Sequence, residues 1–158
     1  MEYDKFKIHC VILFIICSSI SSFLNISVAQ NNSKADAIVG KWLTEDKDAI
    51  VQIFKSKGKY YGRLFWIKDP LDEDGKPKLD KENPDPELRS RPLKGLIFLH
   101  GFVYDEDDNE WEDGKIYDPK TGNTYSSYME LDGNNTLNLR GYIGFSVFGR
   151  TSVWTRKD

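Results

Sequence analysis

Segments that alternate apolar and polar residues, separated by turn-forming residues, constrain the fold of this chain more than any other feature. The pattern is clearest from Trp111 to Tyr125, where aromatic residues flank the Pro119 and Gly122 of a tight turn. Aromatic and β-branched residues favour strands, whereas Pro, Asp and Gly favour chain reversal. The same rhythm continues to Arg156, and no segment shows a helical period over three turns. The sequence therefore predicts an all-β fold built from hairpins.

Eight strands are expected, at residues 38–44, 48–56, 59–68, 95–105, 110–117, 123–131, 136–144 and 146–156. Most connections are short and contain turn residues such as Gly58, Gly122 and Gly133. Eight antiparallel strands with short connections favour an up-and-down barrel, because closure of the sheet removes its exposed edges. A sandwich of two sheets would produce the same pattern, so the barrel is the preferred of two architectures.

The N-terminal segment has the composition of a cleaved signal peptide. Residues 11–17 form a short apolar core, and Ser27 and Ala29 are small residues that suit cleavage after Ala29. A membrane span takes about 20 apolar residues, and this run is shorter. We therefore expect a signal peptide at 1–29, a polar linker at 30–37 and one barrel domain at 38–158, in a protein that is periplasmic or secreted. Lipid attachment at Cys17 is the alternative.

Signal cleavage would leave a mature chain with no cysteine and with His100 as its one histidine. That composition excludes a cysteine nucleophile, a cysteine-ligated zinc and a histidine-pair metal site. The acidic segments 72–75 and 105–108 lack the spacing of a calcium-binding loop, so no metal and no cofactor is expected. The net charge is −3 and the basic residues form no dominant stripe, which argues against a nucleic-acid partner.

Residues 69–94 are expected to form a long loop, and loops of this length in compact domains are commonly lids or binding loops. Asp85 followed by Pro86 is the start signal of a short helical turn with Asp85 as its N-cap. The loop has two interpretations. Arg89 and Arg91 either face the anionic headgroup of a ligand beneath a lid, or pair with neighbouring acids in a structural plug.

Two residues at opposite ends of the predicted domain are expected to meet. A barrel places its first and last strands side by side, so Arg156 would cover the face of Trp42. A cation over an indole ring contributes about 0.5–2 kcal/mol. We therefore expect this pair to cap one end of the barrel.

The chain also carries a series of short motifs in a defined order. They are Gly-Lys-Trp at 40–42, Tyr-Gly-Arg-Leu at 61–64, Asn-Pro-Asp at 83–85, Leu-Arg at 88–89, Arg-Pro-Leu-Lys-Gly-Leu at 91–96, the 111–125 run, Leu-Arg-Gly-Tyr-Ile-Gly at 139–144, Gly-Arg-Thr at 149–151 and Trp-Thr-Arg at 154–156. Together they resemble the bacterial exported family called domain of unknown function 2147, over nearly all of the mature chain. The resemblance implies a lipocalin-like barrel and no established general reaction.

Polar residues of the later strands are the remaining candidates for a ligand site. They are Tyr117, Tyr125, Arg140, Tyr142 and Arg150. Turned inward, they would provide a few polar groups in an aromatic pocket, which is the usual composition of a small-ligand site. The alternation of Arg140 and Tyr142 with apolar neighbours favours an outward direction for those two.

Three classes of function remain open. The first is an exported protein that holds a small hydrophobic or amphipathic ligand inside the barrel. The second is an envelope interaction module with a filled barrel. The third is a hydrolase that uses Asp118 with a second acid, or His100 as a base, although a hydrogen-bonded structural histidine is the preferred interpretation of His100. A carboxylate mechanism requires a raised pKa in an enclosed site, and the sequence contains no recognisable catalytic constellation. We therefore expect a non-enzyme.

Overall fold

The structure is a computed structural model that describes residues 34–157. All of the strands belong to one compact unit, Ala37–Asp158. The predicted signal peptide at 1–29 lies outside the described residues, as do residues 30–33 of the predicted linker.

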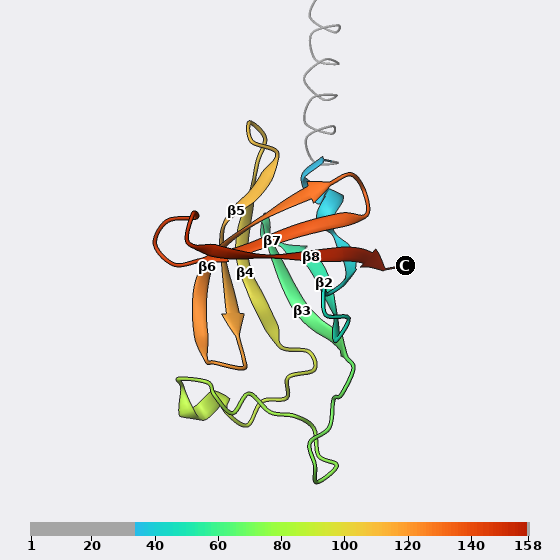
Figure 1. Ribbon diagram of the computed structural model, residues 1–158, viewed down its shortest axis with the longest axis vertical. Helices are drawn as coiled ribbons and strands as arrows, with labels where there is room; N and C mark the ends of the chain where they lie inside the picture. The colour runs from blue at the N-terminus through green and yellow to red at the C-terminus, as the bar shows by residue number, and fades with distance from the viewer. Residues whose placement is uncertain (1–33, 158) are drawn as a thin grey trace, which may run out of the picture. The chain divides into compact units, whose positions relative to one another are not determined.

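Eight antiparallel strands form the domain (Figure 1). They are β1 (Gly40–Leu43), β2 (Ala49–Ser56), β3 (Lys59–Ile67), β4 (Ile97–Asp105), β5 (Glu110–Asp118), β6 (Asn123–Asp132), β7 (Thr136–Tyr142) and β8 (Gly149–Lys157), with 3-10 turns η1 (Asp36–Ile38) and η2 (Pro86–Leu88). Each strand pairs with the next along the chain, and β1 pairs with β8. The predicted closed barrel is therefore confirmed in preference to the sandwich.

Four predicted strand boundaries are wrong by two or three residues, namely the starts of β1, β4 and β8 and the end of β7. Ile38 lies in η1 rather than in a strand, where it is fully buried and its carbonyl accepts a hydrogen bond of 2.8 Å from the Trp42 indole. Pairing of β7 with β8 ends at Tyr142 and Gly149, so residues 143–148 form a loop. The chain turns back there because Gly144 has φ +69° and the Phe148 N–H donates to the Phe145 carbonyl.

Aromatic side chains fill the half of the barrel interior nearest the β2–β3, β4–β5 and β6–β7 turns. Trp42, Tyr60, Phe102 and Trp111 are each at most 1 % exposed. The rings of Tyr60 and Trp111 meet edge to face with their centroids 6.4 Å apart. Large buried aromatic rings dominate the energetics of a core, so this end of the barrel is stabilised by their packing.

Arg156 covers Trp42 at this filled end. Its guanidinium carbon lies 4.2 Å from the centre of the indole ring. It also donates hydrogen bonds to three backbone carbonyls, those of Ala37 (2.7 Å), Val39 (3.3 Å) and Asn134 (2.6 Å). Gly40 permits this approach, since its φ is +143° and a Cβ there would lie 3.0 Å from Nη1 of Arg156. The predicted contact between Trp42 and Arg156 is therefore confirmed.

Replacement of Arg156 by glutamine is expected to lower the free energy of unfolding by roughly 2–4 kcal/mol, because it removes the cation–π contact and the charge-assisted hydrogen bonds. Urea unfolding followed by tryptophan fluorescence measures this change. Arg63→Gln is the matched control, since Arg63 is exposed and hydrogen-bonds Gln52 on the outside of the barrel. Equal stabilities of the R156Q and R63Q proteins would contradict the anchoring role of Arg156.

Candidate functional site

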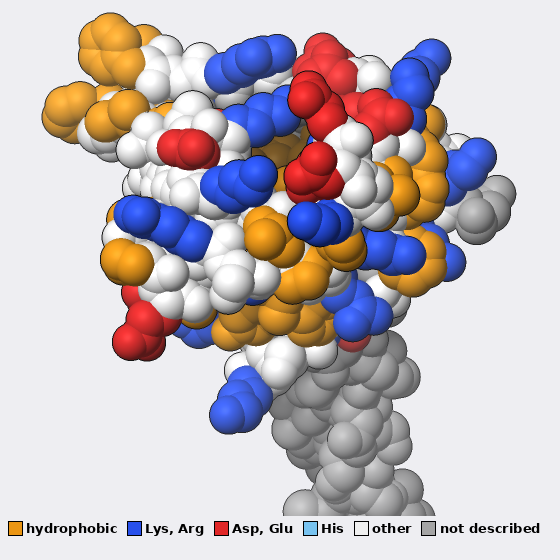
Figure 2. All heavy atoms as spheres, turned by 90° about the horizontal axis from the view of Figure 1, so that it is seen from below, with side chains coloured by type: hydrophobic (Ala, Val, Ile, Leu, Met, Phe, Trp, Pro, Cys, Tyr) orange, Lys and Arg blue, Asp and Glu red, His pale blue; other side chains and the backbone are white. Residues whose placement is uncertain are grey.

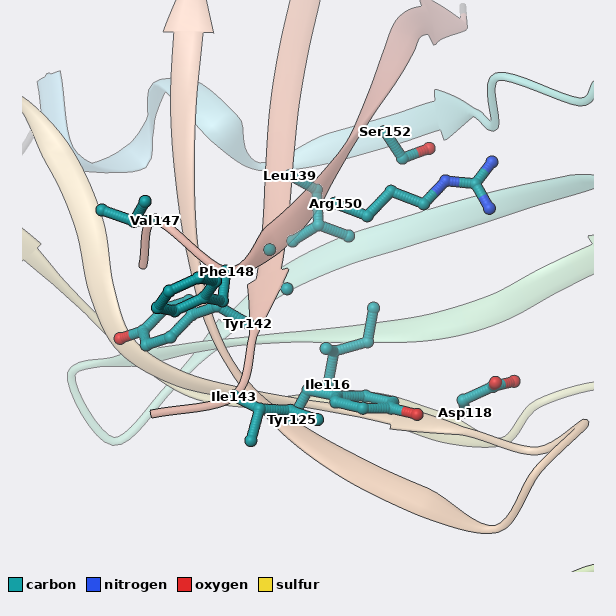
Figure 3. A pocket seen from close by; sticks show the side chains of 12 residues that line it. Ile116, Asp118, Tyr125, Leu139, Tyr142, Ile143, Val147, Phe148, Arg150 and Ser152 are labelled. Atoms are coloured by element: carbon teal, nitrogen blue, oxygen red, sulfur yellow. The ribbon is translucent and has the colours of Figure 1, made fainter. Parts of the chain in front are cut away.

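The opposite end of the barrel is open and holds a pocket. Four connections surround this end, at residues 44–48, 68–96, 119–122 and 143–148. The pocket has a volume of about 750 Å³ and is lined from β5, β6, β7, β8 and the β7–β8 loop (Figure 3). Volumes of roughly 300–1,000 Å³ are typical of small-molecule sites, so the pocket is of suitable size for a ligand.

Apolar side chains make most of the pocket wall. They are Ile116, Leu139, Ile143, Val147 and Phe148. The side chain of Leu139 is buried and continues the inward face of β7. Gly141, two residues further along that face, brings no side chain, and a Cβ there would contact Ile116 at 3.4 Å. The absence of a side chain at this position therefore leaves part of the pocket open.

The β7–β8 loop, residues 143–148, presents large apolar side chains to solvent. The exposed fractions are 70 % for Ile143, 78 % for Phe145, 78 % for Val147 and 74 % for Phe148. Apolar side chains protrude at the left of Figure 2, the side on which this loop lies in Figure 1. Scattered apolar residues are normal on protein surfaces, but a contiguous group of this kind marks a contact site.

Arg140 holds the β7–β8 loop in place. Its Nε donates to the Ser146 carbonyl at 2.8 Å and its Nη2 to the Val147 carbonyl at 3.2 Å. Its Nη1 donates to the Thr151 hydroxyl at 2.9 Å. Because these contacts occupy the guanidinium, Arg140 supports the rim of the pocket and does not line it.

A few polar side chains complete the wall. They are Asp118, Tyr125, Arg150 and Ser152. In Figure 3 the guanidinium of Arg150, the hydroxyl of Tyr125 and the carboxyl of Asp118 lie toward the same side of the pocket. The Asp118 carboxylate accepts hydrogen bonds from the Lys120 N–H (3.0 Å) and the Thr121 hydroxyl (2.9 Å), so it is engaged within the β5–β6 turn.

A buried polar cluster ties the long β3–β4 connection to the barrel. Asp80 is 0 % exposed, and its carboxylate accepts hydrogen bonds from the Tyr117 hydroxyl at 2.6 Å and the Asn83 amide at 2.8 Å. The Arg91 guanidinium forms an ion pair with the same carboxylate at 2.8 Å. Arg89 donates to the Asn83 backbone carbonyl at 2.7 Å. The loop is therefore attached to β5 through the hydrogen bonds of Asp80 and Asn83 with Tyr117, and its two arginines bond within the loop.

This cluster shifts two pKa values in opposite directions. Burial acts to raise the pKa of the Asp80 carboxyl, but the hydrogen bonds from Tyr117, Asn83 and Arg91 and the charge of Arg91 outweigh it and leave the pKa lowered. Burial and then the hydrogen bond to Asp80 raise the pKa of Tyr117. At neutral pH Asp80 is therefore a carboxylate acceptor and Tyr117 a neutral hydroxyl donor.

The structure separates the seven predicted ligand-binding residues into two groups. Those that line the pocket are Tyr125, Tyr142 and Arg150, and those that do not are Arg89, Arg91, Tyr117 and Arg140. Tyr117 alternates along β5 with Ile116 and Asp118, so it faces outward and is covered by the long loop.

Arg89 and Arg91 form their hydrogen bonds within the long loop, which favours the structural plug over the lid with a headgroup site. The predicted turn of η2 is confirmed, with the Glu87 N–H donating to Asp85 at 3.0 Å.

Sequence reasoning missed the apolar wall of the pocket and the buried acid of the long loop. Leu139 and Ile116 resemble ordinary core residues in sequence, and only Gly141 on the same face signals unfilled space. Asp80 lies among many charged residues of an apparently solvated segment, and nothing local distinguishes it. The Asn-Pro-Asp motif at 83–85 is the one signal near this cluster.

The groups that a hydrolase would need are not brought together at the pocket. Among residues 34–157, the carboxyl groups whose pKa is raised are those of Glu110 and Glu112, and burial is the first cause for both. Nearby negative charges raise the pKa further, chiefly that of Glu130 for Glu110 and that of Asp105 for Glu112. Both lie on β5 at the filled end. His100 is exposed, and its ring is perpendicular to that of Tyr61 with the two centroids 6.4 Å apart.

No group of three or more histidine, cysteine or acidic side chains within residues 34–157 is arranged to hold a metal ion. Over the same range, none of the helices has the length and apolar character needed to cross a membrane.

A closed eight-stranded antiparallel barrel, filled at one end and open at the other, defines a lipocalin-like protein. The family model described as "Uncharacterized protein conserved in bacteria (DUF2147)" matches residues 40–156. The chain therefore belongs to this family, as its motifs predicted. It is also similar to a solved structure of protein HP1028 from the human pathogen Helicobacter pylori, which is described as belonging to the lipocalin family. That similarity covers 77 % of this chain and 83 % of the other, with 28 % identity and a TM-score of 0.65. A comparison with curated proteins gave no match.

Replacement of Asp80 by asparagine is expected to lower the free energy of unfolding at pH 7 by about 1.5–3 kcal/mol, the usual contribution of hydrogen bonds to a charged group. The pKa of Asp80 is lower in the folded than in the unfolded protein, where it is about 3.9. Its contribution is therefore present above the unfolded pKa and is lost as the pH falls through the folded pKa.

Urea unfolding at several values between pH 7 and pH 3 measures this dependence. The difference in stability between the unmodified and D80N proteins is expected to narrow in acid. Asp69→Asn is the matched control, because Asp69 is exposed and lies in the same loop. Parallel stability curves for the unmodified and D80N proteins would contradict the role given to Asp80.

Proposed function

We propose that this protein binds a small hydrophobic or amphipathic molecule in the pocket at the open end of the barrel. The observation that carries the proposal is the composition of the pocket wall, in which apolar side chains surround a few polar groups. Val147 and Phe148 belong to that wall although they are 78 % and 74 % exposed. A ligand that covered them would gain about 25 cal/mol for each Å² of apolar surface removed from water.

The filled half of the barrel limits what can bind. Trp42, Phe102 and Trp111 occupy the interior at the other end, so a ligand is confined to the open half and to the rim formed by the β7–β8 loop. The ligand that fits this space is small and meets apolar surface on its inner side. A binding role is favoured over hydrolysis because both Asp118 oxygens already accept hydrogen bonds in their own turn.

An interaction module is the second candidate, and one residue favours it. Phe145 is 78 % exposed at the tip of the β7–β8 loop and does not line the pocket. A partner protein that docked on the rim would cover this ring together with its neighbours. Loss of partner capture on Phe145→Ser, with ligand binding retained, would support this second role.

A side chain that fills the pocket is expected to weaken ligand binding without unfolding the barrel. Gly141→Phe places a ring inside the pocket, where a Cβ meets only ordinary contacts at 3.4 Å and beyond. The neutral fluorescent probe N-phenyl-1-naphthylamine is expected to bind the unmodified protein saturably and this variant at least roughly ten-fold more weakly, which corresponds to about 1.4 kcal/mol.

Asn138→Phe is the matched control for the probe titration, since Asn138 lies on the outward face of the same strand. It is expected to bind the probe like the unmodified protein. Native mass spectrometry of the purified protein provides a second measurement, in which a bound small molecule would be seen as added mass. The binding proposal fails if the unmodified protein shows neither saturable probe binding nor added mass.

We also propose that the protein is exported, which the composition of residues 1–29 supports. Expression of the full chain in a bacterium with separate recovery of periplasm, medium, membranes and cytoplasm tests this. The intact mass of the exported protein is expected to correspond to a chain that begins at Gln30. A chain that begins at a lipid-modified Cys17 would establish the lipoprotein alternative, and an uncleaved cytoplasmic chain would contradict export.

A further inference from the structure

Arg150 differs from every other arginine of the barrel domain in having no protein partner. Arg63, Arg89, Arg91, Arg140 and Arg156 each donate hydrogen bonds to a side chain or to a backbone carbonyl. The exposed side chain of Arg150 makes no hydrogen bond or ion pair within residues 34–157. It lies near the start of β8 and lines the pocket, with its side chain extended along the wall in Figure 3.

No acidic side chain among residues 34–157 forms an ion pair with Arg150. Asp118 is the acid that shares the pocket, and its two carboxylate oxygens accept hydrogen bonds from the β5–β6 turn. The other polar groups of the wall, those of Tyr125 and Ser152, are neutral hydroxyls. The pocket therefore combines one unpaired guanidinium with an apolar surface of Ile116, Leu139 and Phe148.

A bound ligand would remove water from this guanidinium. Desolvation of an unpaired charge is unfavourable, and a neutral ligand would leave that cost uncompensated. A carboxylate or phosphate ester would compensate it, since the planar guanidinium donates two parallel hydrogen bonds to such groups. A site of this composition would select its ligand by charge as well as by apolar contact.

We propose that the ligand is a single-chain amphiphile with an anionic headgroup, which Arg150 binds while the apolar chain lies along Ile116 and Leu139 beneath the β7–β8 loop. This inference rests on the proposed binding function and makes it specific. Arg150 is the residue that determines selectivity for the headgroup, and Tyr125 lies on the same side of the pocket to assist it.

The experiment compares ligands that differ only in the headgroup. Decanoate, decyl phosphate and decanol, each below its micelle concentration, displace N-phenyl-1-naphthylamine from the unmodified protein and from Arg150→Gln, Arg150→Lys and Arg63→Gln. In the unmodified protein at least one of the two anions is expected to bind roughly 10–100-fold more tightly than decanol, the range that charge-assisted hydrogen bonds give.

The variants test whether Arg150 is the cause. Arg150→Gln is expected to weaken the binding of the anions and to leave decanol bound at least as tightly, since the cost of desolvating an unpaired charge is removed, so that the ratio of anion to alcohol affinity comes close to one. Arg150→Lys is expected to keep part of the preference, because an ammonium retains the charge but not the two-pronged donor geometry. The control Arg63→Gln is expected to behave like the unmodified protein.

The outcomes separate this inference from the function on which it rests. Equal affinities for decanol and both anions in the unmodified protein, or an unchanged preference in Arg150→Gln, would overturn the role of Arg150 while binding itself stands. Failure of the probe and of all three amphiphiles to bind would overturn the proposed function instead. A preference for decanoate over decyl phosphate assigns the headgroup as a carboxylate, and the reverse preference assigns it as a phosphate.

Discussion

The structure depends on closure of the sheet between β1 and β8. β1 has only four residues, Gly40–Leu43, and three of them pair with β8, so few backbone hydrogen bonds hold this seam. The guanidinium of Arg156 strengthens it, because it covers Trp42 and binds carbonyls on both sides of the closure. Once the seam is closed, every strand has two neighbours and the sheet has an interior.

That interior is divided by side-chain size. Large rings such as Trp42 and Trp111 occupy one end, whereas Gly141 and Ser152 face the other and leave it open. Packing at the filled end therefore supplies stability, and the open end is free to take part in binding. The rim is also held in place, because Arg140 donates hydrogen bonds to two carbonyls of the exposed loop that borders the pocket.

Four arginines illustrate how the same residue type acquires different roles from its surroundings. Arg156 closes the barrel, Arg91 neutralises the buried Asp80, Arg140 supports the rim, and Arg150 lines the pocket without a protein partner. The sequence predicted the first of these, because Arg156 and Trp42 lie on strands that closure must bring together. It left Arg91 between a ligand headgroup and a neighbouring acid and made Tyr117 a candidate for the ligand site. In the structure both side chains contact Asp80, which is 37 residues from Tyr117 along the chain.

By itself the sequence determined the all-β class, the number of strands and the family, and it favoured a barrel over a sandwich, because local alternation, turn residues and ordered motifs are properties of neighbouring residues. It also placed the helical turn at Asp85, since an N-cap followed by proline is a local signal. Only the tertiary structure decided which end of the barrel is filled and which polar residues are free. A side chain's charge is paired or unpaired according to partners that folding brings from distant segments, and Arg150 and Arg91 look alike until those partners are in place.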